Sequence, residues 1–203
     1  LPGTRFEVVH GKGGSAIGIL NPRSTSGARA LFDAALTRGE RDAVVVCLGE
    51  VDTAYTLWRQ AEFHGVPVTR MFERAITAYL TFLDGIRAHH RLVVLAAPYP
   101  TLGDIAETAD PVLAMRALVK VGQRERTDLA LEFNRRVGIW CAAHGVPLLD
   151  TAEVALGADR LVREDWKVRR RPDHHYARAP FARWLTRALP PALDAVADRP
   201  LDT

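Results

Sequence analysis

Three consecutive residues near the carboxyl end of the chain, Asp173, His174 and His175, have the side chains that acid–base chemistry needs. A carboxylate two residues before an imidazole can orient the ring and stabilise its charged form. This makes His175 a candidate general base and Asp173 its orienting acid. Two adjacent histidines in a polar loop are equally typical of a solvated surface. A metal site is the third interpretation, but no second cluster of histidines or carboxylates stands at ligand spacing, so we expect no metal.

A second candidate lies near the amino end, where Gly13, Gly14 and Ser15 follow a predicted strand. Ser15 is a candidate nucleophile. Equally, it caps the next helix while the glycine amides form an anion-binding turn. The spacing of this segment fits neither a phosphate-binding P-loop nor a dinucleotide fingerprint.

A third group follows a second predicted strand and consists of Gly49, Glu50 and Asp52. Carboxylates at such a position are either site residues or helix caps, and Asp52 is placed to cap the helix that follows. The carboxyl ends of parallel strands meet at one edge of a sheet, where ligands bind. We therefore expect these residues to converge with Ser15 and His175 at that edge.

The elements that must position these residues alternate between strands and helices. Apolar or β-branched runs predict strands over residues 5–10, 42–48, 91–97 and 146–150. Apolar residues at helical spacing predict helices over 26–37, 68–88, 125–143 and 180–196, the last interrupted at Pro190 and Pro191. Near-continuous apolar strands between helices predict a parallel sheet buried on both faces. We therefore expect a single α/β domain over residues 1–203, a three-layer, doubly wound fold.

Composition supports a globular domain. The chain has 203 residues, of which 48% are hydrophobic and 25% charged, which excludes a disordered tail, a collagen-like fibre and a disulfide mini-protein. We interpret the two cysteines, Cys47 and Cys141, as buried free thiols. No apolar run approaches the roughly 18 residues of a membrane span. We expect a soluble cytoplasmic protein with no membrane partner.

The charge is unevenly distributed. Net charge is +3, and residues 159–187 contain nine Lys or Arg against four Asp or Glu, centred on residues 167–171. This excess is typical of a solvated face, of a loop beside an anionic substrate, or of a nucleic-acid patch. Residues 167–171 contain no aromatic residue between the basic ones, which argues against nucleic acid.

Five stretches carry a resemblance to a known family. They are GSAIGILNPRS (14–24), LGEVDTAYTLWRQAEFHGVPV (48–68), APYPTLGD (97–104), ERTDLALEFNRRV (125–137) and PDHHYAR (172–178). Together they resemble the SGNH (GDSL-like) hydrolase superfamily, in a divergent bacterial branch, over residues 14–178. The resemblance implies a flavodoxin-like fold and an esterase, lipase, acyltransferase or carbohydrate deacetylase activity without a cofactor.

The resemblance also implies roles for individual residues. Gly13 or Gly14 matches the glycine whose amide helps to form the oxyanion hole, and residues 49–52 lie where the family has Gly-x-Asn-Asp. Asp173 and His175 lie near the Asp-x-x-His that supplies the orienting acid and the base. We expect the amides of Gly14 and Gly49 to hold the oxyanion, with the side-chain amide of Asn21 as a substitute donor.

Three features depart from the family pattern. The chain contains no Gly-Asp-Ser nucleophile motif, Val51 stands in the place of the oxyanion Asn, and the final motif is Asp-x-His. Three explanations stay open for the first departure. A strand with the nucleophile precedes Leu1, or the nucleophile has been lost, or Ser15 replaces it.

Two functions follow from these observations. The first is an esterase or acyltransferase that acts on a small O-acyl ester of a carbohydrate or secondary metabolite. The alternative is a non-hydrolytic relative that binds or converts an anionic metabolite with a degenerate triad, through Glu50, Asp52, His174 and the basic loop 167–171. A buried ion pair or hydrogen bond from Arg126 or Asn134 to Glu50 or Asp52 would instead make those carboxylates structural.

Overall fold

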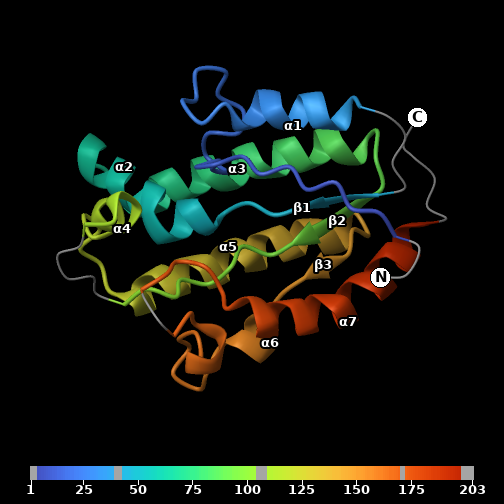
Figure 1. The fold of residues 1–203 in the computed structure, drawn as a ribbon. Coiled ribbons are helices and arrows are strands. Elements are labelled where there is room, and N and C mark those ends of the chain that lie inside the picture. The colour runs from blue at the N-terminus through green and yellow to red at the C-terminus, as the bar shows by residue number, and fades with distance from the viewer. Residues whose placement is uncertain (1–3, 39–42, 104–108, 170–171, 198–203) are drawn as a thin grey trace.

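A small parallel sheet organises the molecule. The computed structural model describes residues 4–38, 43–103, 109–169 and 172–197 (Figure 1). The sheet contains β1 (Val44–Val46), β2 (Leu92–Leu95) and β3 (Leu148–Leu149), in the order β1-β2-β3. Both strand pairs are parallel. The prediction of an α/β protein with a parallel sheet is therefore confirmed.

Helices make up most of the remaining described chain. They are α1 (Ala28–Leu36), the π-helix η1 (Asp52–Thr56), α2 (Leu57–His64), α3 (Val68–Arg87), α4 (Pro111–Arg116), α5 (Gln123–Ala143), α6 (Ala152–Ala155), the 3-10 helix η2 (Glu164–Trp166) and α7 (Arg178–Ala197). The four longest were predicted with nearly these bounds. A helix after Asp52 was expected, and η1 and α2 form there. The short helices α4 and α6 were not predicted, because four to six residues hold too few turns for a periodic pattern.

Helices pack on both faces of the sheet. Consecutive strand residues point to opposite faces, and Val93 and Val94 of β2 are both fully buried. Val93 packs in a cluster with Leu189 and Val196 of α7. Val94 belongs to the main core, to which α3 and α5 contribute most of the large side chains. In Figure 1, α7 accordingly lies on one side of the strands, and α1 and α3 lie on the other.

The β1 side of the sheet differs from the prediction. Residues 5–10 form no strand, and Val8 is 86% exposed. Val45 is 39% exposed and Cys47 is also exposed, so the expectations of a fully buried strand and a buried Cys47 thiol are wrong. The reason is that β1 is an edge strand, because among the described residues it pairs with β2 alone. Cys141 is buried as predicted.

The last helix was predicted to break at Pro190 and Pro191, and this expectation is also wrong. Helix α7 is continuous through both prolines. A proline removes one intrahelical hydrogen bond. Here the flanking residues Leu189 and Ala192 are buried against the sheet, and this packing offsets the loss. Within the described chain, no helix has the length and apolar character needed to cross a membrane.

Candidate functional site

The loop 172–176 holds a histidine–carboxylate pair. His175 Nδ1 lies 2.8 Å from Asp173 Oδ1, and the His175 backbone N–H donates to the same oxygen at 3.0 Å. Partial burial acts to raise the pKa of Asp173, but the bonds from His175 outweigh it, so the pKa is below its usual value. Asp173 is therefore an ionised acceptor that fixes the ring. The imidazole itself is exposed, so its far nitrogen can reach a ligand.

The loop is anchored to the carboxyl ends of two strands. Thr101 Oγ1, beyond β2, donates to the Asp173 carbonyl at 2.6 Å. The Tyr99 backbone N–H donates to the Tyr176 hydroxyl at 2.7 Å, and the same hydroxyl lies 3.1 Å from Thr151 Oγ1, beyond β3. These bonds hold the residues on either side of His175 against the strand edge.

Asp150 and Tyr99 extend this network. The Tyr99 hydroxyl donates to the two carboxylate oxygens of Asp150 at 2.9 and 3.1 Å. Burial raises the pKa of Tyr176 to about 12, and burial together with Asp150 raises that of Tyr99 above its usual value. Both phenols therefore stay protonated. The sequence analysis missed these positioning residues, although Asp150 stands directly after a predicted strand, which was the signal available.

Glu50 reaches the same edge, but its charge is already compensated. Arg116 of α4 binds both carboxylate oxygens, at 2.7 and 2.9 Å, and the two side chains are only 7% and 17% exposed. Burial lowers the pKa of His174, and the nearby Arg116 lowers it further, against the opposing effect of Glu50. The rings of His174 and His175 lie 3.8 Å apart. A closed ion pair and a neutral imidazole thus stand beside the candidate base.

The partner predicted for Glu50 was wrong. Arg126 donates to the carbonyls of Leu102 and Gly103, at 2.8 and 3.2 Å. Asn134 binds the backbone N–H and C=O of Ala97, at 2.9 and 3.0 Å. Both side chains therefore fix the segment that leaves β2. The buried ion pair expected at Glu50 does exist, but it comes from α4, which sequence periodicity did not reveal.

Asp52 binds the turn that carries Ser15. It is fully buried, and its carboxylate accepts the N–H groups of Ala16 at 2.6 Å and Ile17 at 3.0 Å. The interpretation of Asp52 as a cap of its own helix is wrong, because its oxygens bind this turn instead. Burial raises the pKa of Asp52 to about 6, opposed by the two N–H donors. Ser15 Oγ accepts the Gly18 N–H at 3.2 Å.

The predicted oxyanion donors have different surroundings. The Gly14 N–H donates to the Gly11 carbonyl at 3.0 Å and so is engaged in a turn. Gly49 has φ 112°, and a Cβ there would lie 2.5 Å from the Phe133 ring. Asn21 is exposed, and its Oδ1 accepts the Arg23 N–H at 3.0 Å.

The base and the candidate nucleophile belong to two separate groups of contacts. In the described part of the chain, no hydrogen bond joins Ser15 Oγ to His175. Asp173, His174 and His175 form one group with Glu50 nearby, while Ser15 and Asp52 form the other. Glu50 and Asp52, two residues apart, interact electrostatically and connect them.

Two further features concern charge. In the basic loop, Lys167 pairs with Glu164 at 2.6 Å and Arg169 is exposed, whereas Arg170 and Arg171 lie outside the described residues.

The ligand atoms of Asp173, His174 and His175 lie within 4.8 Å of one another, so the triplet has the donors to hold a transition metal ion.

Comparison of the chain with protein-family models, with curated proteins and with solved structures gave no match.

Proposed function

We propose that the protein is an SGNH-like esterase or acyltransferase that acts on a small O-acyl ester. In this proposal the chain folds as a three-layer, flavodoxin-like, doubly wound domain. The observation that carries the proposal is the His175–Asp173 pair, at 2.8 Å and anchored at the carboxyl ends of β2 and β3. A carboxylate bound to Nδ1 leaves Nε2 of a neutral ring as a proton acceptor. An exposed imidazole oriented in this way is the arrangement that a general base requires.

The proposed reaction has two steps. His175 Nε2 removes the proton from the Ser15 hydroxyl as Oγ attacks the ester carbonyl. The tetrahedral intermediate then collapses, the proton passes from His175 to the leaving alcohol, and an acyl-serine remains. Water or an acceptor hydroxyl attacks the acyl-serine in the second step, gives its proton to His175, and releases the acid or a new ester.

The charge around His175 is compatible with this reaction. A free carboxylate at Glu50 would repel the negative charge that develops on the carbonyl oxygen. Because Arg116 binds both oxygens of Glu50, this repulsion is reduced. The amide of Gly49 and the side-chain amide of Asn21 are the proposed oxyanion donors, since the Gly14 amide is engaged in a turn.

A second candidate function is the binding of an anionic metabolite without turnover. The separation of the hydrogen-bonded groups of Ser15 and His175 favours it, because a working triad joins its nucleophile to its base. Exposed Arg169 supplies positive charge for such a ligand.

Fluorophosphonate labelling, followed by intact mass and peptide mapping, distinguishes the two functions. We expect one serine adduct, on Ser15, that is lost in His175→Ala and Ser15→Ala and retained in His89→Ala. His89 is an exposed histidine outside the site, so it controls for loss of an imidazole. An adduct on another serine that still requires His175 would retain the base and replace the nucleophile.

Labelling that survives His175→Ala would refute the proposed base. No adduct on any variant, together with binding of an anionic ligand that weakens in Arg169→Ala, would favour the second candidate. Circular dichroism of each variant shows whether the fold is kept.

A further inference from the structure

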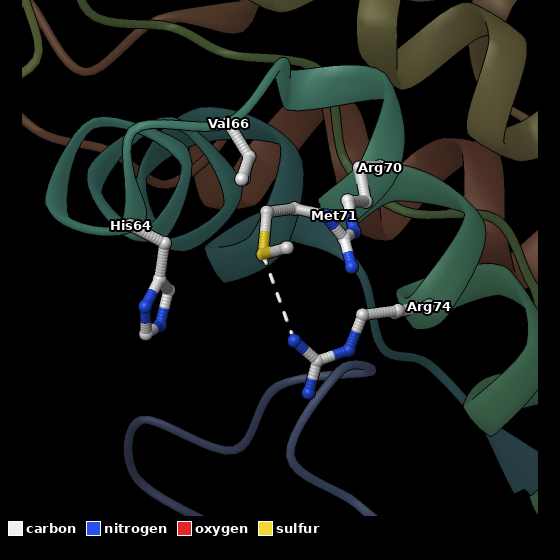
Figure 2. Close-up of a pocket in the computed structure, with 5 residues that line it drawn as sticks. All are labelled: His64, Val66, Arg70, Met71 and Arg74. Carbon is white, nitrogen blue, oxygen red and sulfur yellow. Dashed lines mark hydrogen bonds between the residues drawn. The ribbon is translucent and has the colours of Figure 1, made fainter.

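A cationic pocket lies between the end of α2 and the start of α3. Its volume is about 370 Å³, and it is lined by His64, Val66, Arg70, Met71 and Arg74. Figure 2 shows His64 on one side and the two arginines on the other, with Val66 and Met71 between them. None of these residues belongs to the site proposed above. The pocket is therefore separate from the residues of the proposed catalytic site.

The positive charges of the pocket are not compensated. Within the described residues, neither Arg70 nor Arg74 forms a salt bridge, and the one hydrogen bond of Arg74 is a weak contact from Nη1 to Met71 Sδ at 3.9 Å. The nearest acidic residues in the sequence have other partners. Glu73 binds Arg136, and Glu62 binds Arg59. Two guanidinium groups one helical turn apart thus face the same space, and no carboxylate of the described residues pairs with either of them.

The backbone around the pocket is fixed before any ligand binds. Helix α2 ends at Gly65, which has φ 60°, with its N–H bound to Glu62 O at 3.2 Å. The Val66 N–H binds Ala61 O at 3.0 Å, which completes a Schellman turn. Pro67 then precedes α3, whose first turns carry Arg70 and Arg74. The amino-terminal end of a helix is electropositive, which adds to the attraction for an anion.

We propose that this pocket binds a small organic phosphate. The phosphate group would accept hydrogen bonds from Arg70 and Arg74, whose planar, forked guanidinium groups match its oxygens, and from His64. The apolar part of the ligand would lie against Val66 and the buried Met71. A phosphate ion alone would leave most of the 370 Å³ unfilled, so the proposed ligand carries an apolar body.

Isothermal titration with three probes tests the ligand class. The probes are phenyl phosphate, inorganic phosphate and benzoate. We expect phenyl phosphate to bind more tightly than either of the others, because it alone combines a dianion with an apolar ring. Tighter binding of benzoate would overturn the phosphate assignment. Equal affinity for phenyl phosphate and inorganic phosphate would overturn the proposed contact of the ligand with Val66 and Met71.

Charge-matched variants test the location. We expect Arg70→Gln and Arg74→Gln each to weaken phenyl phosphate binding by about tenfold, the effect of one lost charge-assisted contact. Arg124→Gln removes the same charge from an exposed position in the first turn of α5 and should leave the affinity unchanged. Equal weakening in all three variants would show nonspecific attraction and refute the site.

Both Arg70 and Arg74 are exposed, so these substitutions are not expected to unfold the protein, and a thermal melt of each variant checks this. The assay measures binding alone. Its outcome is therefore independent of whether the protein turns over an ester.

Discussion

The loop that carries His175 and the turn that carries Ser15 are held to the molecule in different ways. The 172–176 loop is hydrogen-bonded to Tyr99 and Thr101, which follow β2, and to Thr151, which follows β3. The turn after Gly14 is hydrogen-bonded to the body of the protein through the carboxylate of Asp52, and its residues Ala16 and Ile19 pack in the main core. The residues before that turn are largely exposed, and β1 beside them is an edge strand.

The difference lies in the long-range hydrogen bonds from side chains, which join the 172–176 loop to several residues and the Ser15 turn to Asp52. Removal of one hydrogen bond from the 172–176 loop leaves others in place. Loss of the Asp52 carboxylate removes both side-chain bonds that hold the Ser15 turn. We expect the 172–176 loop to tolerate the loss of one hydrogen bond better than the Ser15 turn tolerates the loss of the Asp52 carboxylate.

The largest effect is expected at Gly49, which follows β1 and lies against Phe133 of α5 and Ala97 beyond β2. Gly49→Ala should cost roughly 4 kcal/mol of unfolding free energy, since about 1–3 comes from overpacking against Phe133 and about 1–2 from a left-handed backbone. Gly13→Ala is the matched control, with φ 66° and open space around it, and should cost about 1 kcal/mol. Urea denaturation measures both. Equal losses would mean that packing at Gly49 is looser than the 2.5 Å contact implies.

The next largest effect is expected from the ion pair beside His174. Arg116→Met should cost about 3 kcal/mol, because it leaves the mostly buried Glu50 carboxylate without its partner. Arg163→Met breaks an exposed pair with Asp165 and should change stability little. The double substitution Arg116→Met with Glu50→Gln should recover part of the loss. Thermal or urea denaturation that shows no such recovery would contradict this account.

A smaller, pH-dependent effect is expected at Asp52. Its pKa in the folded state, about 6, exceeds the ordinary 3.8, so the folded state binds the proton more tightly than the unfolded state. The stability that this proton provides is complete below the ordinary pKa and is lost as the pH rises through 6. Asp52 should therefore make the protein about 1 kcal/mol more stable at pH 5 than at pH 7.

The measurement for Asp52 is the difference in stability between the wild type and Asp52→Asn at the two pH values. Taking this difference removes the contribution of the other carboxylates. A difference that is independent of pH would show that Asp52 does not titrate in this range.

The smallest effect is expected in the amino-terminal segment. Val8→Ser should change stability by less than about 0.5 kcal/mol, because Val8 is 86% exposed. Val93→Ser, at a fully buried position of β2, is the contrasting variant and should be strongly destabilising. Similar losses at the two positions would show that residues 4–10 pack on the protein in solution.

Much of the fold was predictable where the apolar pattern of the sequence was long and regular. The helix over residues 68–88 and the strand over 91–97 were predicted because their apolar residues face a core on the sides that the pattern indicates. The strand over 5–10 was predicted from the same kind of pattern and does not form. A strand needs a neighbour to accept its hydrogen bonds, and a local sequence pattern does not show whether that neighbour is present.

The candidate site was predictable only in part for a similar reason. The Asp173–His175 bond spans two residues, so spacing alone suggested it. The partners of Glu50, Asp173 and Tyr176 lie 66 to 77 residues away in the sequence, and no local signal connects them. The long-range partners of these site residues could therefore be identified only from the three-dimensional structure.

The Tyr176 hydroxyl has a consequence for the order of folding. It joins the chain after β2, the chain after β3 and the loop beside His175, over sequence separations of 77 and 25 residues. Contacts that close such long loops form late, because the loss of chain entropy precedes the gain from the contact. Helices such as α3 consist of local contacts and need no such closure. During synthesis or refolding, the molecule should therefore acquire most of its helical structure before His175 reaches its working position.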